Sequence, residues 1–139
     1  MKVELERIDD KFQFQAKTED HAINIMANPN LCNQGSTGFR PMQLLLSSLA
    51  SCLSIDVLNI LYKQRAQIQT FKVEVDSQRA NAIPAVFEQI ELHFQITGQV
   101  EASRVQNAIN LGVERYCSVY HSLSPNIKIN SKFTLNHEQ

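Results

Sequence analysis

The sequence lacks an excess of charge of either sign. Its 139 residues include 13 basic and 14 acidic side chains, which give a formal net charge of −1 at pH 7. Binding to nucleic acid needs basic side chains that neutralise phosphates, so this balance argues against a nucleic-acid partner. The chain also lacks a glycine-rich phosphate loop and a His-Glu-x-x-His site. Its 43% of apolar residues are nevertheless enough to bury a core.

An uninterrupted apolar run of membrane-spanning length is also missing. The most apolar stretch, residues 44–61, is broken by four serines, Asp56 and Asn59. A lipid-spanning helix rarely tolerates so many polar groups, so we expect no membrane partner. The first seven residues do not form the apolar region of a signal peptide. A domain usually has roughly 100–200 residues, so we expect a single soluble, cytoplasmic domain over residues 1–139.

The cysteines do not form a recognisable pairing motif. Cys32, Cys52 and Cys117 include no Cys-x-x-Cys pair, and the four histidines add no metal-ligand spacing. The sequence therefore predicts no metal site. Without an export signal, the thiols are expected to be reduced. Cys32 lies in a loop without an activating charge, so we expect an ordinary thiol that is half-buried or at the surface.

Apolar periodicity predicts the order of the secondary structure. A helical pattern covers residues 42–65 and another covers residues 101–122. Period-two alternation predicts strands in six segments: 2–8, 12–16, 22–27, 71–76, 90–96 and 127–135. The order βββ–α–ββ–α–β predicts an α+β fold. We expect an antiparallel sheet of about six strands with two main helices on one face.

The helix expected at residues 42–65 is apolar nearly all round over its first five turns. Such a helix must be covered on more than one side. One sheet and one further helix leave part of it exposed, and large exposed apolar patches usually mark interfaces. We therefore expect a homodimer whose interface includes this helix.

A polar stripe runs along this apolar helix. Ser48, Cys52, Asp56 and Asn59 follow one another at offsets of four, four and three, which places them on one helix face. A buried carboxylate must find partners or take up a proton, so Asp56 is the most costly member. A structural pairing of Asp56 near the helix end is an equal alternative. Cys117, on the second predicted helix, is 65 residues from Cys52, and the fold order allows the two to meet.

Two motifs resemble those of a known family. Residues 40–57 (Arg-Pro-Met-Gln-Leu-Leu-Leu-Ser-Ser-Leu-Ala-Ser-Cys-Leu-Ser-Ile-Asp-Val) resemble the central-helix signature of the OsmC/Ohr family of osmotically induced and organic-hydroperoxide-resistance proteins. Residues 115–119 (Arg-Tyr-Cys-Ser-Val) resemble its second cysteine motif, and the resemblance covers essentially the whole chain. It is closest to the YhfA-like branch, because Met42 stands where the characterised peroxidases carry a glutamate and the family's active-site arginine has no clear match.

The resemblance implies an OsmC-like, intertwined homodimer with thiol-dependent peroxidase activity in oxidative-stress defence. Cys52 would attack an organic hydroperoxide, and Cys117 would resolve the product as a disulfide. A lipoyl or thioredoxin-like dithiol would then reduce that disulfide, with no metal or organic cofactor. Arg40, Gln43 and Asp56 are the candidate assisting residues.

A second hypothesis is a dimer without catalytic activity. It would sense redox state through its cysteines or bind a small apolar ligand. The pocket for such a ligand would be lined by apolar and aromatic side chains: Met42, Leu45, Leu49, Tyr116 and Tyr120.

Overall fold

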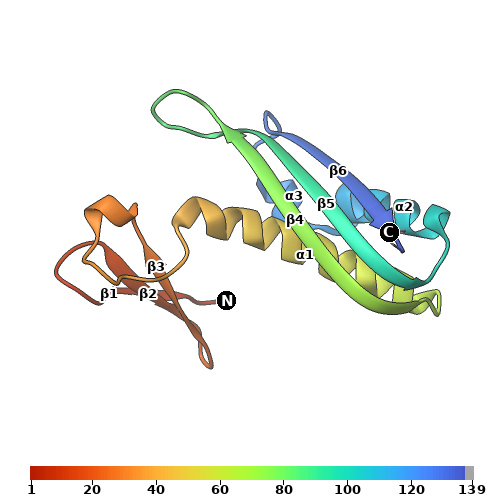
Figure 1. Cartoon of the computed structure of the whole chain (residues 1–139), viewed down its shortest axis with the longest axis horizontal. Helices are drawn as coiled ribbons and strands as arrows, with labels where there is room; N and C mark the ends of the chain where they lie inside the picture. Colours follow the sequence, from red (N-terminus) through yellow and green to blue (C-terminus); the bar gives the residue numbers. More distant parts are fainter. Residues whose placement is uncertain (137–139) are drawn as a thin grey trace. The chain divides into compact units, whose positions relative to one another are not determined.

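The computed structural model describes residues 1–136 and divides the chain into two compact units, Met1–Leu46 and Ser47–Gln139. The long helix α1, Pro41–Lys63, begins in the first unit and continues into the second (Figure 1). The assignment of residues 1–139 to a single domain stays a prediction.

The first unit is built on a three-stranded antiparallel sheet in the order β1-β2-β3. Its strands are Glu4–Arg7, Gln13–Lys17 and Ala22–Met26. A short 3-10 turn, η1 (Pro29–Leu31), then leads to Cys32. Cys32 is buried, which corrects the expected half-buried or surface position. The Cys32 Sγ lies 3.7 Å from one backbone carbonyl oxygen and 3.8 Å from another, so this thiol is held by weak hydrogen bonds inside the first unit.

Helix α1 begins where the sequence predicts it. Pro41 takes the first helical position, where its missing N–H costs nothing. The backbone N–H of Arg40 donates to the Gln43 Oε1 at 2.9 Å, which is the side-chain half of a capping box. Four side chains at four-residue spacing are buried along one stripe: Leu49, Leu53, Val57 and Leu61. Much of the remaining apolar surface of α1 is open, with Ile55 68% exposed and Tyr62 56% exposed.

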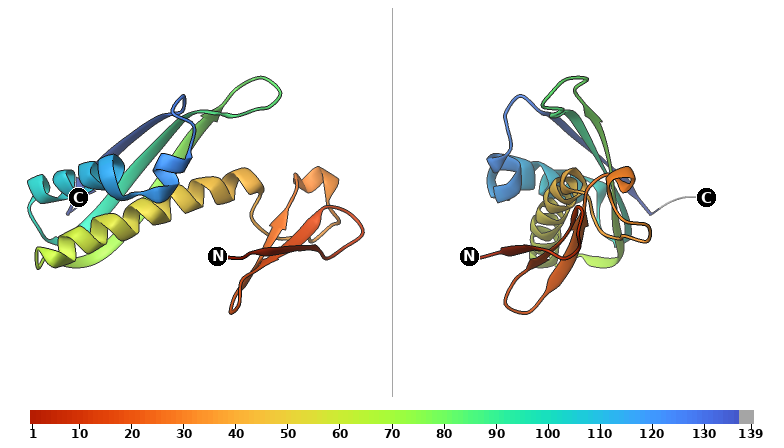
Figure 2. Two further views of the ribbon diagram at one scale, coloured as in Figure 1. Left: turned by 180° about the vertical axis from the view of Figure 1, so that it is seen from behind. Right: turned by 90° about the vertical axis from the view of Figure 1, so that its left-hand side faces the viewer.

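The second unit packs its helices on one face of a sheet with the order β4-β5-β6 (Figure 2). The strands are Gln67–Arg79, Phe87–Gln99 and Lys128–Leu135. Strand β5 is central and turns alternate apolar side chains into the core: Phe87, Ile90, Leu92, Phe94 and Ile96. The α+β class, the number of strands and the element order are confirmed.

The arrangement of the strands differs from the expected single antiparallel sheet. The six strands form two sheets of three, and β6 pairs with β5 in parallel. The parallel pairing has a physical reason, because β6 returns to the sheet after a helical crossover rather than a tight turn.

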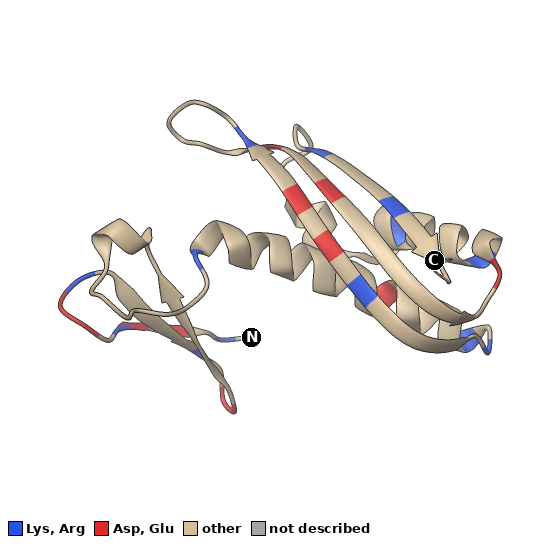
Figure 3. Cartoon of the chain, in the orientation of Figure 1, with Lys and Arg blue, Asp and Glu red and all other residues tan. Residues whose placement is uncertain are grey.

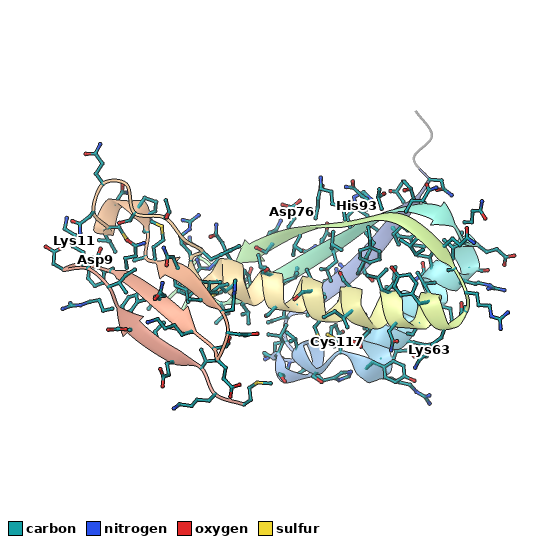
Figure 4. The ribbon with its side chains drawn as sticks, turned by 90° about the horizontal axis from the view of Figure 1, so that it is seen from below. Asp9, Lys11, Lys63, Asp76, His93 and Cys117 are labelled. Atoms are coloured by element: carbon teal, nitrogen blue, oxygen red, sulfur yellow. The ribbon has the colours of Figure 1, made fainter. Side chains whose placement is uncertain are left out.

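The other face of the second sheet is polar. Figure 3 shows charged residues of both signs along β4, β5 and β6. Asp76 and His93 point away from α1 (Figure 4). The His93 Nε2 lies 2.7 Å from the Thr134 Oγ1, so this face is tied together by side-chain hydrogen bonds. The helices therefore cover only the apolar face.

The second predicted helix, residues 101–122, is not continuous, and this corrects the sequence prediction. It consists of α2 (Ala102–Leu111), a π-helical turn η2 (Gly112–Tyr116) and a short helix α3 (Ser118–Ser122). The Cys117 N–H bonds to the Gly112 carbonyl at 2.9 Å, five residues back, and Cys117 itself is extended at φ −72° and ψ 103°. The wide π turn changes the direction of the chain at Cys117, one residue before α3 begins. The sequence has no proline at this break.

Leu53 joins α1 to this broken helix, so its truncation tests the packing. Leu53 is 0% exposed, and we expect Leu53→Ala to lower the free energy of unfolding by about 2–5 kcal/mol because it leaves a cavity. The matched control Ile83→Ala, at a loop side chain that is 101% exposed, should cost less than about 0.5 kcal/mol. Denaturant unfolding measures both values, and equal losses would contradict the packing described here.

Candidate functional site

Two thiols and a carboxylate form a cluster in the second unit. The Sγ atoms of Cys52 and Cys117 and a carboxylate oxygen of Asp56 all lie within 4.8 Å of one another. Cys52 and Asp56 are one turn apart on α1, and Cys117 comes from the break between η2 and α3. Both cysteines are free thiols, Cys117 buried and Cys52 half-buried. The fold thus brings together two sulfurs that are 65 residues apart in the sequence.

Gly112 sets how closely the broken helix approaches α1. A Cβ added at this position would stand 3.4 Å from the Leu53 Cδ2, 3.7 Å from the Asp56 Cβ and 3.9 Å from the Val57 Cγ2. A larger side chain would therefore push the two helices apart at the level of the cluster. The backbone at Gly112 therefore lies about one methyl group away from α1, five residues before Cys117.

The backbone around Cys117 fixes its sulfur. Cys117 is the N-cap of α3, and its Sγ accepts a hydrogen bond from the Tyr120 N–H at 3.3 Å. The Cys117 carbonyl accepts from the His121 N–H at 3.1 Å. Figure 4 shows Cys117 beside α1. The thiol is thus held in one orientation by the start of a helix.

Burial dominates the electrostatics of Cys117. It raises the pKa of this thiol from the ordinary value of 9.0 to about 11. This value already includes the Tyr120 N–H, which lowers the pKa, and the contact with Cys52 and the negative charge of Asp56, which both raise it. Cys117 is therefore protonated at neutral pH and is a weak initial nucleophile, because the thiolate is the reactive form.

The carboxylate of Asp56 is incompletely satisfied. Its Oδ2 is buried and has no hydrogen-bond partner among the described residues. Among these residues, the Gln64 Oε1 is the only other buried side-chain oxygen or nitrogen without a partner. Both residues line one cavity of about 320 Å³ beside the cluster. The other lining residues are Asn59, Ile60, Lys63, Leu111 and Tyr116. A small molecule in this cavity would lie against the carboxylate of the cluster.

The structure places the predicted site residues in two groups. Cys52, Asp56 and Cys117 meet in the second unit. Arg40 and Gln43 lie in the first unit, where Arg40 is exposed and the Gln43 side chain caps α1. Their assisting roles stay predictions.

The sequence motifs point to none of three residues near the site. No motif or spacing in the sequence singles out Lys63 or Gln64, yet both line the cavity with Asp56. Gly112 lies where the broken helix packs on α1. It falls inside the continuous helix that the sequence predicts over residues 101–122. A glycine at a position facing α1 was the available signal for close helix contact.

Fold and cluster together define an α+β protein with a paired-thiol site. The chain matches the family described as OsmC-like protein over residues 33–132. It is 33% identical to protein YhfA of Escherichia coli K12 over 102 residues, which are 73% of this chain and 76% of YhfA. The chain therefore belongs to the OsmC-like family.

Solved structures have the same fold. An OsmC-like protein from Mycoplasma pneumoniae superposes with a TM-score of 0.82 at 22% identity, covering 98% of this chain and 96% of that one. The organic hydroperoxide resistance protein OhrB of Bacillus subtilis superposes with a TM-score of 0.64 at 14% identity, covering 96% and 98%. At these identities the likeness establishes the architecture.

Helix α1 is long and apolar enough to cross a membrane, with a mean hydropathy of 1.9 over its best window. The core helix of a soluble protein satisfies the same criterion, so this is weak evidence for a span. Proteins of the OsmC-like family are soluble. In α1, 22% of that window is buried, as the single stripe of Leu49, Leu53, Val57 and Leu61.

The raised pKa of Cys117 gives a direct test of the cluster. We expect its thiol to stay protonated through pH 9.0, with a titration midpoint at about 11. Asp56→Asn should lower this midpoint, because it removes a negative charge that disfavours the thiolate. The pH dependence of the Cys117 Cβ chemical shift in carbon-13-labelled protein measures both. A midpoint below 9.0, or one that Asp56→Asn leaves in place, would contradict the electrostatics of the cluster.

Proposed function

We propose that this protein is a cytoplasmic, thiol-dependent peroxidase that reduces organic hydroperoxides in oxidative-stress defence. The observation that carries the proposal is the pair of free thiols, Cys52 and Cys117, with their sulfurs within 4.8 Å of each other. Membership of a family with hydroperoxide-resistance proteins among its structural neighbours supports the same reaction. The nearby cavity of about 320 Å³ supplies room for a small substrate.

Cys52 is the attacking residue in this proposal. It is the more exposed of the two thiols, whereas Cys117 is buried and has a pKa raised to about 11. The Cys52 thiolate attacks the O–O bond of a hydroperoxide ROOH. The sulfur takes one oxygen and becomes a sulfenic acid, and the second oxygen leaves as RO⁻, which takes up a proton to give the alcohol.

Cys117 is the resolving residue. Its sulfur attacks the sulfenic sulfur of Cys52, forming a disulfide and releasing water. The thiol must lose its proton in this step, and the carboxylate of Asp56 in the same cluster can accept it. A lipoyl or thioredoxin-like dithiol then exchanges with the disulfide, restoring both thiols and becoming oxidised itself.

A homodimer forms part of the proposal. In the second unit α1 exposes Ile55 and Tyr62, while it buries a single stripe of four residues. Water-exposed apolar surface of this extent on a long helix favours burial against a second copy. Dimers are typical of OsmC/Ohr homologues.

The first test is the loss of peroxide consumption in a cysteine variant. We expect Cys52→Ser to abolish the consumption of an organic hydroperoxide, such as cumene hydroperoxide, in the presence of excess dithiol. A serine hydroxyl is too weak a nucleophile to replace the thiolate. Cys32→Ser is the matched control and should keep full activity, since this cysteine lies in the other unit. Unchanged consumption by Cys52→Ser would make the catalytic assignment wrong.

Mass spectrometry of the oxidised protein separates the peroxidase from the alternative of a ligand-binding dimer. One equivalent of hydroperoxide should yield a Cys52–Cys117 disulfide in the wild type. In Cys117→Ser, a sulfenic acid should remain trapped on Cys52. Thiols that stay unmodified under the same treatment would favour the non-catalytic binder.

The dimer is tested separately by its mass. We expect the chain to sediment at about twice 15.8 kDa at micromolar concentration. Ile55→Glu should shift the mass to that of a single chain, because it places a charge in the proposed apolar interface. Ile83→Glu, in a loop, should leave the mass unchanged. A wild-type mass near 15.8 kDa would contradict the dimer.

A further inference from the structure

The cluster of Cys52, Asp56 and Cys117 also has the chemistry of a metal site. Thiolate sulfur and carboxylate oxygen are both ligands of Zn²⁺. The sequence offers no close ligand pair, yet the fold supplies three donor atoms within 4.8 Å of one another. Cys52 and Asp56 lie one helical turn apart on α1, and Cys117 comes from the break after η2.

The separations suit a tetrahedral ion. With Zn–S bonds of about 2.3 Å, two sulfurs on one tetrahedral ion stand about 3.8 Å apart. Donor atoms that already lie within 4.8 Å of one another need only small side-chain movements to reach that geometry. Three protein ligands leave the fourth position open to water or another small ligand.

The Oδ2 of Asp56 is the observation that points to a cation. This oxygen is buried and has no hydrogen-bond partner among the described residues. A buried carboxylate oxygen without a partner is costly, and its negative charge disfavours thiolates beside it. A divalent cation bound by all three groups would remove both costs at once.

The donors are also held in place before any ion binds. Cys52 and Asp56 project from the middle of α1, and the Cys117 sulfur is oriented by the Tyr120 N–H at 3.3 Å. Ligands on rigid elements with a fixed orientation are what a metal site requires. The cavity lined by Asp56 provides an approach for the ion.

We propose that the reduced protein binds one Zn²⁺ ion, or a similar thiophilic divalent ion, through the sulfurs of Cys52 and Cys117 and the carboxylate of Asp56. Binding replaces the two thiol protons, which are released to solvent. A disulfide between the two cysteines offers no thiolate, so the ion binds only to the reduced form. The inference stands on the cluster's geometry and does not depend on peroxidase activity.

Titration with Co²⁺, a spectroscopic substitute for Zn²⁺, tests the site in reduced, oxygen-free protein. We expect thiolate-to-cobalt charge-transfer absorption that saturates at one ion per chain. Cys52→Ser and Cys117→Ser should each remove about half of its intensity, since each deletes one of two thiolates. Each of these variants and Asp56→Asn should weaken binding by about tenfold or more, because even groups that only orient a ligand change metal affinity 10–100-fold.

Cys32→Ser is the matched control, and its absorption should equal that of the wild type. Absence of charge-transfer absorption would overturn the proposal, as would absorption that Cys32→Ser abolishes and Cys52→Ser spares. Thiol alkylation of the wild type avoids any dependence on the folding of the variants. Zn²⁺ should slow the modification of Cys52, the more exposed thiol of the pair, and leave that of Cys32 unchanged. Equal rates for Cys52 with and without Zn²⁺ would refute the site.

Discussion

The close contact between α1 and the turn at Gly112 is the constraint on which the site depends. A Cβ at Gly112 would stand within 3.4–3.9 Å of three side chains of α1, so the helices meet without an intervening side chain. From that contact the π turn carries the chain to Cys117, which caps α3 beside Cys52. The paired thiols are thus a product of helix packing, and the sheet beneath them provides the apolar surface that holds both helices.

Burial then gives the two thiols different chemistry. Cys117 is withdrawn from solvent and its pKa is raised to about 11, whereas Cys52 keeps part of its surface open. Asp56 adds a negative charge that opposes ionisation of the buried thiol. The same carboxylate gives the cluster one hard oxygen donor beside the two soft sulfur donors. The same arrangement would suit both the proposed reaction, which oxidises the thiols, and the proposed cation, which would hold them reduced.

Most of the fold followed from apolar periodicity, because strands and helices each have one buried face. The six strands, the long helix and their order were all predictable. The parallel pairing of β6 and the break at Cys117 were not, because both depend on contacts between distant segments. In the site, the four-residue spacing predicted that Cys52 and Asp56 share one helix face. The contact of Cys52 with Cys117 was expected only from the family resemblance. The place of Lys63 in the cavity was not predictable, because the cavity is also lined by Leu111 and Tyr116, which are distant in the sequence.

A crystal structure of the reduced protein at a resolution that fixes sulfur positions tests the central claim most directly. The account predicts an interrupted helix at Cys117 and Sγ atoms of Cys52 and Cys117 within 4.8 Å of each other, next to the Asp56 carboxylate. An unbroken helix through residues 101–122, with the Cys117 sulfur turned away from α1 and into a separate part of the core, would contradict it.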